Sequence, residues 1–169
     1  MIFKKVVPTI FFLLTCLFIT SALRADISSS DLRSRFQLPS SEWVWVKGKD
    51  SHDFLNIDHK KLGKALNIAG RTDTIAFDAK TYLTEVRKLL PEDKKNYGDA
   101  QINLVETKNL FGKEWVAVKI SAPDGLKQEM WSRKISTTQV LLLLYTGIGE
   151  PFDQYHGDFD KILERASSL

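Results

Sequence analysis

The sequence feature that most restricts the fold is an apolar run at residues 140–145, within TTQVLLLLYTGIGEPF. Six residues between turn signals have the length of a β-strand and are too few to cross a membrane, although a helix over 140–144 is the alternative. Side chains alternate along a strand, so one face holds Leu141, Leu143 and Tyr145 and the other holds Val140, Leu142 and Leu144. Both faces of the sheet must therefore be covered at this strand.

The segment before this run predicts an antiparallel meander. Residues 109–112 and 123–125 are rich in turn formers, and 136–138 make a shorter joint. The runs between them are rich in Val, Ile, Trp and Leu. We expect four strands, at about 101–107, 113–121, 126–135 and 138–146.

Two segments have the three-and-four spacing of an amphipathic helix. In residues 73–91 the apolar stripe consists of Ala79, Tyr82, Leu83, Val86, Leu89 and Leu90. In the last segment, where Asp158 is the expected N-cap, it consists of Phe159, Ile162, Leu163 and Ala166.

One helix on each face would cover the sheet. The sequence thus predicts an α+β fold class, an α/β/α sandwich with a central, mostly antiparallel sheet and a long helix on each face. A cystatin-like fold, in which a meander wraps one helix, is the alternative. It fits the leucine strand poorly, because it leaves one sheet face open.

The first half of the chain is less regular. Residues 26–41 are a serine-rich lead-in segment, in which we expect a short, loosely packed helix capped near Ser30. Alternating apolar residues predict a strand at 43–46, and 52–58 is its candidate partner. Residues 59–73 are a connection to which the pattern assigns no structure.

Residues 1–25 have the pattern of a secretory signal peptide. Lys4 and Lys5 precede an apolar stretch of about 14 residues, shorter than the roughly 20 that a spanning helix needs. We expect cleavage near Ala25 and a periplasmic or secreted protein. The alternatives are an uncleaved signal anchor and a lipid on Cys16, whose LLTC context loosely resembles a bacterial lipobox.

Removal of the signal changes the charge balance. The chain has 24 Lys and Arg against 21 Asp and Glu, and three of the bases but none of the acids lie in residues 1–25, which leaves 21 of each. The basic character belongs to the signal, so nucleic acid is not an expected partner. We expect membrane contact only through the transient signal peptide, and an unidentified protein or small ligand of the envelope as partner.

The mature chain has no cysteine, since Cys16 leaves with the signal. Without disulfides, its stability must come from the core. A chain of this size has enough surface to bury for one domain, which we expect to be a monomer that needs no cofactor.

No residue pattern in the sequence names a reaction. The three histidines lack the spacing of metal ligands and are interpreted as solvated loop residues: His52, His59 and His156. Capping and solvation explain the paired carboxylates, which are Glu150 with Asp153 and Asp158 with Asp160. GxSxG is absent, and GIGEPF lacks the third glycine of a phosphate-binding loop. We therefore predict no catalytic residue and no metal ligand.

The four tryptophans lie in predicted strands, where a core position is the usual one. They are Trp43, Trp45, Trp115 and Trp131. Trp131, which stands between EM and SRK, is the one expected to be exposed. It is the candidate for a binding surface, because an aromatic ring offers a large contact area.

Four stretches carry a resemblance to a known fold: LPSSEWVWV, EWVAVKI, EMWSRKI and VLLLLYTGIGEPFDQYHGDFDKILERASS. Their order resembles the PsbP-like fold, named for an extrinsic photosystem II subunit and also seen in small bacterial envelope proteins of the DcrB type. The resemblance implies one domain over residues 42–169. It also implies a non-enzymatic binding or assembly role, as for most members of that fold. No functional residue carries over.

The function that the sequence favours is that of an exported, non-catalytic binding or assembly protein of the cell envelope. The alternative is a small envelope hydrolase with a carboxylate site that the pattern does not reveal. Two acids with displaced pKa values in a cleft would favour the hydrolase. An apolar surface patch without such acids would favour binding.

Overall fold

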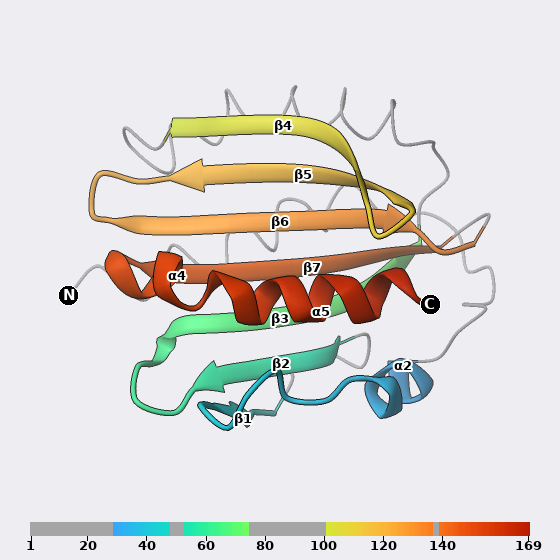
Figure 1. The fold of residues 1–169 in the computed structure, drawn as a ribbon, viewed down its shortest axis with the longest axis horizontal. Helices are drawn as coiled ribbons and strands as arrows, with labels where there is room; N and C mark the ends of the chain where they lie inside the picture. Colours follow the sequence, from blue (N-terminus) through green and yellow to red (C-terminus); the bar gives the residue numbers. More distant parts are fainter. Residues whose placement is uncertain (1–28, 48–52, 75–100, 137–138) are drawn as a thin grey trace.

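The computed structural model describes residues 29–47, 53–74, 101–136 and 139–169. Their centre is one antiparallel sheet of seven strands in the order β1-β2-β3-β7-β6-β5-β4 (Figure 1). The strands are β1 (Trp43–Trp45), β2 (Asp53–His59), β3 (Gly63–Thr74), β4 (Gln101–Leu110), β5 (Lys113–Ser121), β6 (Leu126–Lys134) and β7 (Gln139–Ile148).

The four predicted meander strands are β4 to β7, and their bounds lie within three residues of the expected ones. β7 is the middle strand, paired with β3 on one side and β6 on the other. The α+β class and the antiparallel sheet with the leucine strand at its centre are therefore confirmed. The helix considered for residues 140–144 is wrong.

Both faces of β7 are buried, as its alternating apolar residues require. Leu141, Leu143 and Tyr145 belong to a core that includes the C-terminal helix. On the opposite face, Val140, Leu142 and Leu144 are at most 6% exposed. This burial argues against the cystatin-like alternative, in which one face of the sheet is open.

The connection at residues 59–73, to which the pattern assigned no structure, contains β3. Its glycine, lysine and asparagine residues are poor strand formers, but β3 pairs with β2 on one side and with β7 on the other, so the sheet imposes its conformation. Gly70 lies where a Cβ atom would come within 2.7 Å of the Phe54 ring, so the close packing of β2 on β3 requires glycine there.

Within the described ranges, three short helices accompany the sheet: α2 (Ser29–Arg35), α4 (Glu150–Gln154) and α5 (His156–Ser167). α4 and α5 lie along β7 on one face (Figure 1). The predicted apolar stripe of the last helix is confirmed, since Phe159, Ile162, Leu163 and Ala166 are all buried. The predicted cap is wrong, because α5 begins at His156 with Tyr155 as N-cap and Asp158 lies in its first turn.

The long helix expected on each face is not found among the described residues, whose longest helix is the 12-residue α5. The helix predicted within residues 73–91 lies almost wholly outside the described ranges. None of the described helices has the length and hydrophobicity needed to cross a lipid bilayer. Residues 1–25 lie outside the described ranges too, so the signal peptide, its cleavage and the lipid on Cys16 stay predictions.

The lead-in segment is not loosely packed, as far as it is described. Leu32 of α2 is fully buried, and Phe36 lies with its ring centroid 5.0 Å from that of Phe54 in β2. The short helix predicted near Ser30 is confirmed as α2. Leu32 and Phe36 belong to the core, and Phe36 packs on β2, which explains why a polar segment is fixed there.

Candidate functional site

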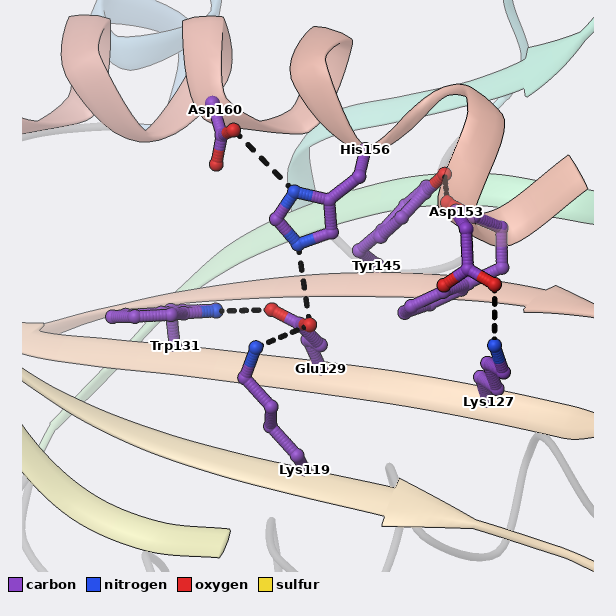
Figure 2. A network of polar contacts seen from close by, with 9 residues as sticks. Lys119, Lys127, Glu129, Trp131, Tyr145, Asp153, His156 and Asp160 are labelled. Carbon is purple, nitrogen blue, oxygen red and sulfur yellow. Dashed lines mark hydrogen bonds and ion pairs between the residues drawn. The ribbon is translucent and has the colours of Figure 1, made fainter. Parts of the chain in front are cut away.

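A cluster of polar side chains lies between the sheet and α5, and Figure 2 shows it at close range. Glu129 of β6 is at its centre. Lys119 of β5, Trp131 of β6 and His156 of α5 converge on its carboxylate, and Asp160 stands behind the histidine. We call these five residues the Glu129 network.

The pairing of strands β5, β6 and β7 determines where the residues of the network lie. Glu129 lies directly opposite Lys119 on β5 and directly opposite Tyr145 on β7. Trp131 stands two residues along β6, so it projects from the same face. α5 covers this face, and its first residue, His156, reaches the carboxylate from above (Figure 2).

Both carboxylate oxygens of Glu129 accept hydrogen bonds. Nζ of Lys119 donates to Oε1 at 2.6 Å, and Nε1 of Trp131 donates to Oε2 at 3.0 Å. Nε2 of His156 lies 3.2 Å from Oε1, and its Nδ1 lies 3.4 Å from Oδ2 of Asp160. The Glu129 side chain is only 6% exposed, so these partners replace the water that an ionised carboxylate needs.

These contacts determine the charge of Glu129. Burial alone raises the pKa of this carboxyl group, but hydrogen bonds from His156, Lys119 and Trp131 outweigh it and lower the pKa from 4.5 to about 2. The hydrogen bond to Glu129 raises the pKa of His156 above 6.5, against the effect of burial. Both shifts favour the ionised form of the Glu129–His156 pair.

Tyr145 closes the network on the β7 side. Its hydroxyl donates to the carbonyl oxygen of Phe152 at 2.8 Å, and its ring stacks on those of Phe152 and Phe159. Burial, followed by the charge of Glu129, raises the pKa of Tyr145, so the phenol stays protonated. α4 and α5 are thus joined to the centre of the sheet by a hydrogen bond, stacked rings and an ion pair.

A second polar contact joins α5 to the lead-in segment. Oδ2 of Asp158 accepts hydrogen bonds from Oγ of Ser40 at 2.9 Å and from Nε1 of Trp43 at 2.8 Å, and Oδ1 accepts one from Lys161. Burial raises the pKa of Asp158, but the hydrogen bonds from Lys161, Trp43 and Ser40 lower it overall. Asp158 therefore connects two distant parts of the chain.

The exposure predicted for Trp131 is wrong. Its ring is 4% exposed, and its Nε1 atom is a donor in the Glu129 network. The core positions predicted for tryptophans are confirmed for Trp43 and Trp115, and Trp45 is half-buried. A binding role for Trp131 stays a prediction.

Two of the histidines are not solvated loop residues. His59 ends β2, is 1% exposed and packs against the rings of Trp43 and Tyr155. His156 is half-buried in the Glu129 network. His52 lies outside the described residues.

The predicted carboxylate pairs are separated by their partners. Asp153 pairs with Lys127 and Asp160 with His156, while Asp158 binds Trp43. Over the described ranges, no three His, Cys, Asp or Glu side chains come together as metal ligands could. The pairs therefore form no common acidic site.

The sequence pattern did not single out Glu129, and it led to the interpretation of His156 as a solvated loop residue; the two lie on separate elements. One signal was available in the sequence. Glu129 and Trp131 are two residues apart on a predicted strand, so they lie on the same face, and the preceding strand of the meander contains Lys119. A glutamate at a core-facing strand position needs a cation. The histidine could not be found this way, because its place depends on how α5 lies on the sheet.

No family model matches the sequence, and no curated protein matches it. Among solved structures, the chain is similar to cyanobacterial PsbP (CyanoP) from Synechocystis sp. PCC 6803, with a TM-score of 0.52 and 14% identity, over 74% of this chain and 81% of that one. A Pseudomonas aeruginosa protein of unknown function has a TM-score of 0.41 and 14% identity, over 60% and 73% of the two chains, which is too distant to carry an argument. The likeness to cyanobacterial PsbP shows the fold alone, and it confirms the PsbP-like fold.

Proposed function

We propose that this chain is an exported, non-catalytic binding or assembly protein of the cell envelope, cleaved near Ala25, with residues 42–169 as one monomeric functional domain. The charge state of the Glu129 network supports the non-catalytic part of this proposal. A carboxyl group with a pKa of about 2 is too weak a base to take a proton from a nucleophile near neutral pH. The network instead joins α5 to strands β5 and β6 of the sheet.

A small envelope hydrolase is the alternative, and one observation favours it. The His156 side chain is 31% exposed and lies between two carboxylates, as in acid–base sites. However, the two ring nitrogens face Glu129 and Asp160, so within the described part of the chain neither faces a hydroxyl or thiol that it could activate. This geometry supports binding over catalysis.

The catalytic alternative is tested with the purified protein and panels of ester, amide, glycoside and phosphate-ester substrates. Wild type, Glu129→Gln and His156→Gln are compared, after circular dichroism has shown that the variants are folded. We expect no turnover above that of buffer. Turnover that both substitutions abolish would overturn the proposal in favour of the hydrolase.

The binding role and the export are tested separately. Affinity capture from an envelope extract should retain a partner, and sedimentation at micromolar concentration, with and without a chelator, should show a folded monomer. Mass spectrometry of the protein from the expressing cell should give a chain that begins near Asp26. A retained Met1 would contradict cleavage, and a lipid on Cys16 would replace it with an anchored form.

A further inference from the structure

The turn between β2 and β3 concentrates positive charge around an apolar side chain. Lys60, Lys61 and Lys64 are exposed, and Leu62 between them is 37% exposed. Five consecutive residues thus carry three ammonium groups and no acid, in a chain whose residues after 25 are formally neutral. The turn lies at a corner of the sheet, at the ends of β2 and β3 (Figure 1).

Folding does not explain this composition. The ion pairs recorded among the described residues involve other cations, such as Lys119, Lys127 and Lys161, and leave the three lysines of the turn in solvent. Leu62 is one of three large apolar side chains exposed in the described ranges, the others being Val44 and Phe111. Mutual repulsion of the lysines costs stability, and Leu62 gains less from folding than a buried leucine does.

Val44 lies at the same corner. It belongs to the edge strand β1, is 42% exposed, and pairs in register with Asp58, two residues before Lys60. The backbone N–H of Lys60 also donates to the carbonyl oxygen of Glu42, which ties the turn to β1. Two of the three exposed apolar side chains therefore lie beside the basic turn.

The chemistry of this corner favours a lipid surface over an acidic macromolecule. Lysine is a flexible point charge that suits mobile headgroups, whereas ordered recognition of phosphate or carboxylate favours the fork of arginine, which the turn lacks. The turn has no aromatic ring on which a base could stack. Its most prominent apolar group is a leucine between lysines, the pairing found where a surface dips into the headgroup region.

We infer that the β2–β3 turn is a contact site for anionic lipid headgroups, with Lys60, Lys61 and Lys64 on the headgroups and Leu62 in the interface. The inference rests on the proposed function for its location in the envelope, and it names a partner. It also revises the expectation that only the signal peptide meets a membrane. The balanced net charge concealed this site, because it averages over the whole surface.

The test is co-sedimentation with vesicles of 30% phosphatidylglycerol in phosphatidylcholine, against phosphatidylcholine alone, at low and high salt. Lys61→Gln/Lys64→Gln should lower the partition coefficient on anionic vesicles roughly 30-fold. The control Lys113→Gln/Lys134→Gln removes the same charge from exposed positions elsewhere and should change it less than about twofold. All variants share residues 1–25, so any binding by that segment cancels in the comparison.

Leu62→Ser separates the apolar contact from the charges. It should weaken binding roughly fivefold and leave the salt dependence unchanged, because it removes only the inserted side chain. Equal effects of the turn pair and the control pair, or no preference for anionic vesicles, would overturn the inference. Tighter, lysine-dependent binding to polyglutamate or to duplex DNA would also overturn it. These outcomes are independent of the substrate assays, so failure here leaves the non-catalytic proposal standing.

Discussion

Trp43 and Asp158 are 115 residues apart in the sequence, yet Nε1 of the tryptophan donates a hydrogen bond of 2.8 Å to Oδ2 of the aspartate. Trp43 is fully buried, so this carboxylate is the means by which its indole N–H is satisfied. The contact joins the edge strand β1 to the first turn of α5. Loss of this hydrogen bond should therefore affect the packing of both β1 and α5.

Asp158→Ala should lower the free energy of unfolding by about 1–3 kcal/mol, because it leaves the N–H of Trp43 buried without its partner. Asp153→Ala is the matched control, since Asp153 is exposed in its ion pair with Lys127 and its loss should cost less than about 1 kcal/mol. Urea denaturation followed by tryptophan fluorescence measures both. Equal losses would show that Asp158 acts only as a surface charge.

Lys119→Met should destabilise the protein by about 2 kcal/mol, because Glu129 would keep its burial and lose a charged donor. Lys127→Met breaks the exposed pair with Asp153, and we expect a change of less than about 1 kcal/mol. The comparison uses the same substitution on neighbouring strands. A larger loss of stability in Lys127→Met than in Lys119→Met would contradict the prediction that Glu129 depends on its charged donor.

The network should make stability depend on pH in two opposite directions. The pKa of Glu129 is lowered from 4.5 to about 2, so its contribution is complete above pH 4.5 and is lost as the pH falls towards 2. The pKa of His156 is raised above 6.5, so its contribution is complete below pH 6.5 and is lost as the pH rises through the raised value. The other charged or titratable groups that face this pair are Lys119 on β5, Tyr145 on β7 and Asp160 on α5.

Thermal unfolding from about pH 2 to about pH 9 checks this dependence. Wild type should lose stability above pH 6.5, and His156→Gln should lose less over the same interval. If the melting temperatures of wild type and His156→Gln fell equally above pH 6.5, the loss of stability would be due to groups other than His156.

Leu142→Asp and Leu143→Asp should each destabilise by more than about 4 kcal/mol, since each forces a charge into one of the two buried faces of β7. Leu62→Asp, at an exposed leucine, is the control and should stay within about 0.5 kcal/mol. Soluble yield and denaturation curves measure the difference. A folded Leu142→Asp protein would mean that the face opposite α5 is open to water.

Phe111→Asn should stabilise the protein by about 0.5–1 kcal/mol. Phe111 and Gly112 form the tip of the β4–β5 hairpin, both with positive φ, and asparagine followed by glycine is the preferred pair for such a turn. The ring is 52% exposed, so little packing is lost. Gly112→Val should destabilise the protein, because valine is strained at the positive φ of this position. If Phe111→Asn were destabilising as well, the Phe111 ring would have a packing role.

The parts of the fold that the sequence predicted are those in which local pattern and sheet position agree. The leucine strand could be placed at the centre because both of its faces are apolar, and the meander because its turns have their own residue signals. The stripe of α5 followed from spacing alone. Each of these signals lies within one element and its neighbours in the chain.

The remaining parts depend on contacts between distant segments. β3 has weak strand formers, and it is a strand because β2 and β7 supply its hydrogen bonds. Trp131 stands beside charged residues in sequence, which suggested exposure, but one of them, Glu129, is its hydrogen-bond partner inside the fold. The position of His156 depends on the way α5 lies on the sheet, which no short pattern encodes.

The pairing of β3 with β7 has a consequence for the order in which the chain assembles. Thr74 of β3 pairs with Gln139 of β7, so the β1–β3 unit joins the rest of the sheet only after the whole segment between them has been synthesised. No more than four residues separate consecutive strands from β4 to β7, so these strands can pair early. The pairing of β3 with β7 joins segments that are far apart in the sequence, so it is slow. Until β3 docks, the edge of the leucine strand is open to another chain, and aggregation during folding should start there.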